Sequence, residues 1–121
     1  MELEVLETEL AICKLKSLED IDIDGELYFL CKTDDEISLV CPASAIPRDA
    51  IEQSTGWRAF RICGTFDFSL VGILSKISGI LAAEDIGLFA VSTFNTDYIL
   101  VKEQYLNRAI ESLSNNGYRF I

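Results

Sequence analysis

The segment "STFNTDYILVKE" at residues 92–103 carries a high density of polar side chains between two apolar runs. A hairpin needs one or two turn-forming residues, yet five side chains here can form hydrogen bonds. They are Ser92, Thr93, Asn95, Thr96 and Asp97. A carboxylate beside hydroxyl and amide groups suits the binding of an ammonium or guanidinium group. The same residue types also close turns on their own backbone, so turn formation is the alternative interpretation.

A second segment, "TFDFSLVG" at residues 65–72, connects a predicted strand to the start of a predicted helix. Backbone N–H groups at a helix start lack intrahelical partners and lie at the positive end of the helix dipole, so a carboxylate is a natural occupant. Gly72 has no Cβ and would let a ligand approach the backbone closely. The alternative is a capped helix whose glycine packs on the sheet.

Other chemistry is disfavoured by the residues that the chain lacks. There is no histidine, which removes the commonest general base and the Ser/His and Cys/His nucleophile pairs. No spaced pair of acids stands out, so an enzyme is not expected. Four cysteines lie far apart within apolar runs, which predicts buried strand residues rather than zinc ligands or disulfides: Cys13, Cys31, Cys41 and Cys63. No metal or cofactor is expected.

Length and charge narrow the class of protein. At 121 residues, half of them apolar, the chain has the size of one ordinary domain or of two small units sharing a core. A formal net charge of −10 disfavours binding to nucleic acid or to a membrane surface. No window reaches the roughly 18 apolar residues of a membrane span, and the first residues lack the basic start of a signal peptide. We therefore expect a cytoplasmic protein.

The chain resembles itself when it is shifted by 61 positions. The shift aligns "GWRAF" (56–60) with "GYRFI" (117–121), and "EISLV" (36–40) with "DYILV" (97–101). Nearer the start of each half the offset falls to 50, so the first half lacks about eleven residues between its first two strands. We interpret the chain as a duplication whose first copy has lost its first helix.

Helical periodicity fills the longer interval of the second half. Apolar residues recur at helical spacing through "FSLVGILSKISGILAAED", which predicts a helix at 68–84 capped by Asp67 or Ser69. A second helix is predicted at 103–115, while its counterpart at 43–55 contains Pro47 and can at best start a short helix. Strands are predicted at 9–15, 26–32, 36–41, 57–65, 86–94, 97–102 and 117–121, with tight turns at 33–36 and 94–97.

The order of elements across 57–121 is β-α-β-β-α-β, the ferredoxin-like split βαβ unit. We expect an α+β fold of two such repeats packed as one compact body, with an antiparallel sheet and the helices on one face. Residues 1–56 would form an abbreviated repeat and residues 57–121 a complete one. In this unit the second strand ends beside the end of the first, which would place the 92–97 turn next to the 65–72 loop.

Most of residues 66–102 resembles an ACT domain, through "SLVGIL" followed by "GLFAVSTFNTDYILV". More narrowly, the chain is similar to small tandem ACT proteins related to CASTOR-type arginine sensors. The first half matches much more weakly, because its first helix is missing. The resemblance implies a regulatory module whose usual ligands are free amino acids, often bound where two ACT units meet.

These observations predict an amino-acid-binding regulatory protein with its ligand between the 65–72 loop and the 92–97 turn. Asp97 would neutralise an ammonium or guanidinium group, and Phe66, Phe68 and Phe94 would surround an apolar stem. The predicted ligand-binding residues are Asp67, Phe68, Ser69, Leu70, Val71, Gly72, Thr93, Phe94, Asn95, Thr96 and Asp97. Exposed edge strands predict a homodimer, and signalling would go through a separate protein partner or through oligomerisation. The alternative is an ACT-shaped interaction module that binds no ligand and acts through dimerisation.

Overall fold

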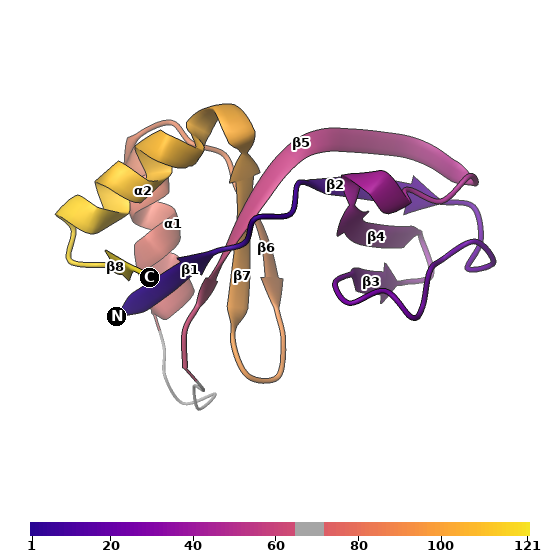
Figure 1. Ribbon diagram of the computed structural model, residues 1–121, viewed down its shortest axis with the longest axis horizontal. Helices are drawn as coiled ribbons and strands as arrows, with labels where there is room; N and C mark the ends of the chain where they lie inside the picture. The colour runs from indigo at the N-terminus through magenta and orange to yellow at the C-terminus, as the bar shows by residue number, and fades with distance from the viewer. Residues whose placement is uncertain (65–71) are drawn as a thin grey trace. The chain divides into compact units, whose positions relative to one another are not determined.

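The computed structural model of the protein describes residues 1–64 and 72–121. The chain divides into two compact units (Figure 1). The helical unit comprises Met1–Glu7 and the described residues of Arg58–Ile121, and the strand unit comprises Thr8–Trp57. One long strand, β5 (Ala50–Ile62), contributes residues to both units.

The helical unit combines a sheet with two α-helices. Across the sheet the strands follow the order β8–β1–β5–β7–β6. Besides β5, the elements are β1 (Glu2–Val5), α1 (Ile73–Ala83), β6 (Phe89–Ser92), β7 (Asp97–Lys102), the 3-10 turn η2 (Glu103–Tyr105), α2 (Leu106–Asn115) and β8 (Arg119–Phe120). The predicted βαββαβ order is present as β5–α1–β6–β7–α2–β8, so the ferredoxin-like α+β fold is confirmed.

A strand that the sequence analysis did not predict, β1, lies between β5 and β8. Leu3 pairs with Ile62 in an antiparallel ladder and with Phe120 in a parallel one. The sheet is therefore mixed rather than purely antiparallel. The alternation of glutamate and apolar residues in "ELEV" has the period of two that a strand requires, and Leu3 is fully buried.

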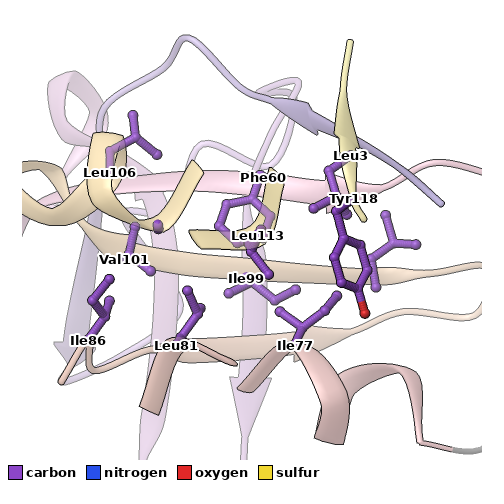
Figure 2. Close-up of a cluster of buried hydrophobic side chains, with 12 residues drawn as sticks. Leu3, Phe60, Ile77, Leu81, Ile86, Ile99, Val101, Leu106, Leu113 and Tyr118 are labelled. Atoms are coloured by element: carbon purple, nitrogen blue, oxygen red, sulfur yellow. The ribbon is translucent and has the colours of Figure 1, made fainter. Parts of the chain in front are cut away.

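Both helices pack on the same face of this sheet, as predicted (Figure 2). Ile77 and Leu81 of α1 are buried against strand residues such as Phe60 and Ile99. Residues three and four apart share one side of a helix, which is why the apolar spacing predicted this face. The buried side chains of α2 that complete the cluster are Leu106, Ala109 and Leu113. Burial of each large aliphatic side chain contributes about 1.5–3 kcal/mol, so the cluster is the main stabilising feature of this unit.

The strand unit contains no α-helix, and each of its residues is described. Its strands follow the order β3–β4–β2–β5. The elements are β2 (Leu10–Leu15), β3 (Phe29–Lys32), β4 (Ile37–Pro42), the 3-10 turn η1 (Ala43–Ala45) and the first part of β5. No α-helix lies between β2 and β3. The second helix is reduced to η1, because Pro47 cannot donate a helical hydrogen bond, and β5 begins at Ala50 rather than at 57.

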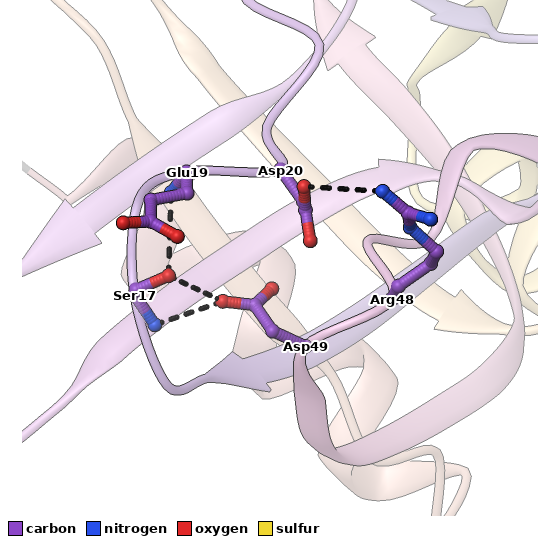
Figure 3. Close-up of polar contacts among 5 residues, drawn as sticks. All are labelled: Ser17, Glu19, Asp20, Arg48 and Asp49. Atoms are coloured by element: carbon purple, nitrogen blue, oxygen red, sulfur yellow. Dashed lines mark hydrogen bonds and ion pairs between the residues drawn. The ribbon is translucent and has the colours of Figure 1, made fainter.

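A loop takes the place of the helices in the strand unit. Ile21 and Tyr28 from this loop pack on the core that contains Cys13 and Cys41. Asp49 fastens the start of the loop, because its Oδ2 accepts hydrogen bonds from the backbone N–H of Ser17 at 3.0 Å and from its hydroxyl at 2.7 Å (Figure 3). The loop thereby covers apolar strand residues that a helix covers in the helical unit.

The hairpins β3–β4 and β6–β7 have equivalent registers at an offset of 60 residues rather than the predicted 61. Phe29 pairs with Val40, and Phe89 pairs with Leu100. A change of one residue moves a side chain to the opposite face of a strand. When the two hairpins are aligned by their ladders, Leu39 corresponds to the buried core residue Ile99 and not to Leu100, with which the sequence shift aligns it.

Candidate functional site

The polar turn between β6 and β7 spans residues 93–96, one residue earlier than predicted. The backbone N–H of Thr93 donates to the carbonyl oxygen of Thr96 at 2.8 Å. Asp97 is consequently the first residue of β7 and pairs with Ser92 across the hairpin. Its carboxylate therefore projects from a strand, where the ladder holds the backbone more firmly than a turn would.

The two threonine hydroxyls of this turn are engaged with backbone atoms. Thr93 Oγ1 donates to the carbonyl oxygen of Thr96 at 3.0 Å and accepts from the Thr96 N–H at 3.3 Å. Thr96 Oγ1 donates to the carbonyl oxygen of Ile62 at 2.7 Å. Ile62 is the last residue of β5, so this hydrogen bond ties the turn to the strand that precedes residues 65–72 in the sequence.

Three other predicted residues of the turn region are accessible to different degrees. Phe94 is 81% exposed, Asn95 is exposed and Asp97 is half-buried. A phenylalanine exposed at a turn tip offers apolar area that a ligand or a partner could cover. Phe94, Asn95 and Asp97 are therefore better placed for ligand contact than the two threonines.

Five predicted binding residues lie outside the described residues: Asp67, Phe68, Ser69, Leu70 and Val71. Gly72, the sixth of this group, is the residue from which α1 begins, with a φ of 84°. A Cβ built there would meet no atom of the described residues within 4 Å. Its positive φ, which residues with a Cβ rarely adopt, is the reason for a glycine at this position.

A charged pair that was not predicted from the sequence lies next to Ile62, the residue that binds the Thr96 hydroxyl. Arg61 precedes Ile62 on β5, and its Nε and Nη2 contact Glu4 Oε1 at 2.8 and 2.6 Å. Hydrogen bonds with Tyr98 and with Glu4 raise the pKa of Arg61. The interaction was not predictable because Glu4 belongs to β1, the strand that the sequence analysis did not identify.

The start of α1 also borders a cavity of about 310 Å³. It is lined by Met1, Gly72, Ile73, Lys76, Asn116, Gly117 and Tyr118.

Within the described ranges, no three cysteine, aspartate or glutamate side chains are grouped so that they could hold a metal ion. No helix among the described residues is long and apolar enough to cross a membrane.

The order of elements, the helices on one face and the turn held beside the end of β5 define a ferredoxin-like α+β domain. Residues 52–115 match the ACT domain family, and the chain belongs to this family. The match begins within β5 and ends at the last residue of α2.

The chain is similar to known proteins in sequence and to solved structures in fold. The chain is 39% identical over 84 residues to the human protein "Cytosolic arginine sensor for mTORC1 subunit 1", a match that covers 64% of this chain and 26% of the sensor. An Agrobacterium tumefaciens protein, Atu0741, has a crystal structure that is 32% identical, with a TM-score of 0.86 over 99% of this chain and 91% of that one. The regulatory subunit of aspartate kinase from Thermus thermophilus shares the fold at 8% identity, with a TM-score of 0.62 over 93% of this chain and 95% of that one.

Proposed function

We propose that this protein is a non-enzymatic, cytoplasmic regulatory protein that binds a free amino acid between the 65–72 loop and the 92–97 turn. Membership of the ACT family supports a regulatory role, and the matched relatives are named as cytosolic arginine sensors. The match spans about a quarter of those sensors, so the proposal names amino acids as a class rather than arginine.

The observation that carries the proposal is the hydrogen bond from Thr96 Oγ1 to the Ile62 carbonyl. It holds the β6–β7 turn beside the end of β5, the strand that precedes residues 65–72 in the sequence. In this arrangement Asp97 would pair with the ligand's ammonium group and Asn95 would add a hydrogen bond, while the main chain near Gly72 would face the carboxylate. Thr93 and Thr96 would shape the turn and would not contact the ligand directly.

We further propose that the strand unit is an abbreviated copy of the helical unit, in line with the division predicted from the sequence. Both hairpin turns are closed by a threonine, Thr33 or Thr93, whose N–H donates to the carbonyl three residues later at 2.9 or 2.8 Å. The tips differ, because Asp34 and Asp35 replace Phe94 and Asn95. We therefore assign the amino-acid site to the turn of the helical unit.

Isothermal titration calorimetry with each of the twenty amino acids tests this proposal. We expect at least one amino acid to bind, and we expect Asp97→Asn to weaken that binding about 10- to 100-fold, because a charge-assisted hydrogen bond is lost. Asp35→Asn, on the corresponding turn of the strand unit, is the matched control and should bind as the parent does. The proposal fails if no amino acid binds, or if Asp97→Asn binds with the parent's affinity.

The exposure of Phe94 favours a second candidate function, an interaction module without a ligand. This candidate predicts a homodimer, or a complex with a separate protein, that buries the tip of the turn. Sedimentation equilibrium of the parent and of Phe94→Ser distinguishes the two candidates. A dimer that dissociates on this substitution, in a protein that binds no amino acid, would support the interaction module.

A further inference from the structure

One edge of the sheet in the strand unit is open. β3 pairs with β4 on one side and, among the residues that the structure describes, with no strand on the other. Figure 1 shows β3 at the end of this sheet, beyond β4. An open edge presents unpaired backbone N–H and C=O groups, onto which an extended chain can pair as a further strand.

The register of the hairpin identifies which backbone groups of β3 face this edge. The N–H of Thr33 donates to the carbonyl oxygen of Glu36 at 2.9 Å. Hydrogen-bonded pairs alternate with non-bonded pairs along an antiparallel ladder, so every second residue of β3, counted back from Thr33, bonds with β4. Leu30 and Lys32 are the residues that do not, and their N–H and C=O groups therefore point to the open edge.

An apolar row of side chains reaches this edge and ends there in water. Cys13, Leu39 and Leu30 lie opposite one another on β2, β4 and β3. Directly opposite residues share a face of the sheet, and this face carries the core of the strand unit. Cys13 and Leu39 are 2% and 1% exposed, whereas Leu30 is 42% exposed. An apolar side chain on an added strand would cover Leu30 and extend the core by one strand.

Acidic residues at both ends of β3 select the kind of strand that can be added. Within residues 22–36 the only basic residue is Lys32. The acidic residues of this range are all exposed and flank the strand: Asp22, Asp24, Glu26, Asp34, Asp35 and Glu36. A segment with basic residues at its ends and apolar residues between them complements this edge.

A second copy of β3 does not complement the edge. Two identical edges pair about a two-fold axis, so the start of one β3 would lie opposite the end of the other. Glu26 of one copy would then approach Asp34 and Asp35 of the other, and like charges that face each other across a ladder destabilise it. The charges thus protect this edge against pairing with itself.

We propose that β3 binds an extended, basic segment of a partner protein as an additional strand. The backbone groups of Leu30 and Lys32 form the hydrogen bonds, and the side chain of Leu30 forms an apolar contact. The acidic residues at the two ends of β3 attract lysine or arginine residues of the segment. The site shares no residue with the proposed amino-acid site, and its test does not depend on whether an amino acid binds.

Fluorescence anisotropy with a labelled synthetic peptide tests this site. The peptide alternates threonine and valine between two lysines at each end. We expect it to bind the parent protein, and we expect the same peptide with glutamate in place of lysine not to bind. A third peptide keeps the lysines but carries N-methyl groups on its threonine and valine amides. It should bind at least about 10-fold more weakly, because these amides can no longer donate hydrogen bonds to the edge.

Two substitutions at Lys32 separate strand pairing from attraction of charge. Lys32→Pro and Lys32→Gln both remove a positive charge, which by itself favours a basic peptide. Lys32→Pro also removes the outward N–H and places a ring at the edge, so it should bind the lysine peptide about 10-fold more weakly than Lys32→Gln does. Because this N–H does not bond with β4, both variants should keep the fold, which thermal unfolding checks. If Lys32→Pro unfolds, the N-methylated peptide provides the same comparison on the parent.

A matched pair of double variants tests the acidic ends. Asp34→Asn combined with Asp35→Asn should weaken binding of the lysine peptide about 3- to 10-fold. Glu84→Gln combined with Asp85→Asn makes the same change of charge in the helical unit and should leave binding unchanged.

The proposal is overturned if the lysine peptide does not bind the parent, if N-methylation leaves its affinity unchanged, or if the two double variants bind alike. A dimer of the parent that Lys32→Pro dissociates would also overturn it, because β3 would then pair with a second copy.

Discussion

Thr96 donates its hydroxyl hydrogen to the carbonyl oxygen of Ile62 across 2.7 Å, although the two residues are 34 positions apart. The bond joins the turn that follows β6 to the last residue of β5. It satisfies a carbonyl at the end of a strand and restrains the turn that carries Phe94 and Asn95. A single side chain thus links the turn that carries Asn95 to the strand that precedes residues 65–72 in the chain.

Thr96→Val should lower the free energy of unfolding by about 1–2 kcal/mol, because the Ile62 carbonyl loses its partner while the side-chain volume is kept. Thr96→Ser retains the hydroxyl and should lose less. Urea unfolding of both variants measures the difference. Equal stabilities for the valine and serine variants would show that the hydrogen bond contributes nothing.

Two glycines of similar surroundings should respond to alanine in opposite directions. At Gly72 and at Gly79, a Cβ would meet no atom within 4 Å among the residues that the structure describes. Gly79 lies within α1 without a positive φ, so Gly79→Ala should stabilise the protein by up to about 1 kcal/mol. Gly72 has a φ of 84°, so Gly72→Ala should destabilise it by about 1 kcal/mol or more. Thermal unfolding of the two variants measures both signs.

Leu81→Ala should lower the free energy of unfolding by about 2–5 kcal/mol. Leu81 is fully buried on the core-facing side of α1, and truncation of its side chain leaves a cavity. Leu18→Ala is the matched control, since Leu18 is 45% exposed and should cost less than about 1 kcal/mol. Chemical denaturation of both variants is the measurement. Comparable losses would mean that the helical core is not the main source of stability.

The thiol of Cys41 should make the free energy of unfolding fall at alkaline pH. Burial, together with the charge and hydrogen bond of Cys13, raises the pKa of Cys41 from 9.0 to about 12. Between these values the unfolded chain loses a proton that the folded protein keeps, so stability falls as pH rises from about 9 towards 12. The urea midpoint of the parent should therefore fall more steeply over this range than that of Cys41→Ala. Parallel pH profiles would contradict the prediction.

The helices of the helical unit were predictable because their apolar periodicity is local. Ile77 and Leu81 are one turn apart and lie on one face wherever the helix forms. Gly117 likewise marked the end of α2, since a residue with a positive φ ends many helices and glycine adopts it readily. These features depend on neighbours within about four residues, which the sequence displays directly.

The position of the turn and the register of the hairpins were less predictable. Identities between Leu39 and Leu100 suggested an offset of 61, whereas the paired strands require 60. Both offsets align apolar residues of one hairpin with apolar residues of the other, so residue type alone does not distinguish the two offsets. The register is determined by the turn, where the Thr93–Thr96 hydrogen bond places Asp97 at the start of β7.

The sequence by itself determined the fold class, the family and the two helices, because these depend on periodicity and local motif. Only the tertiary structure decided that residues 2–5 form a strand, since four residues become a strand by pairing with β5 and β8. It likewise decided which polar side chains of "STFNTD" bind backbone and which remain accessible. The hydrogen bond between Thr96 and the Ile62 carbonyl joins segments that are distant in sequence, and so does the cavity that Gly72 and Tyr118 help to line. The physical reason is that a hydrogen bond or a cavity needs two surfaces, and a local pattern describes one.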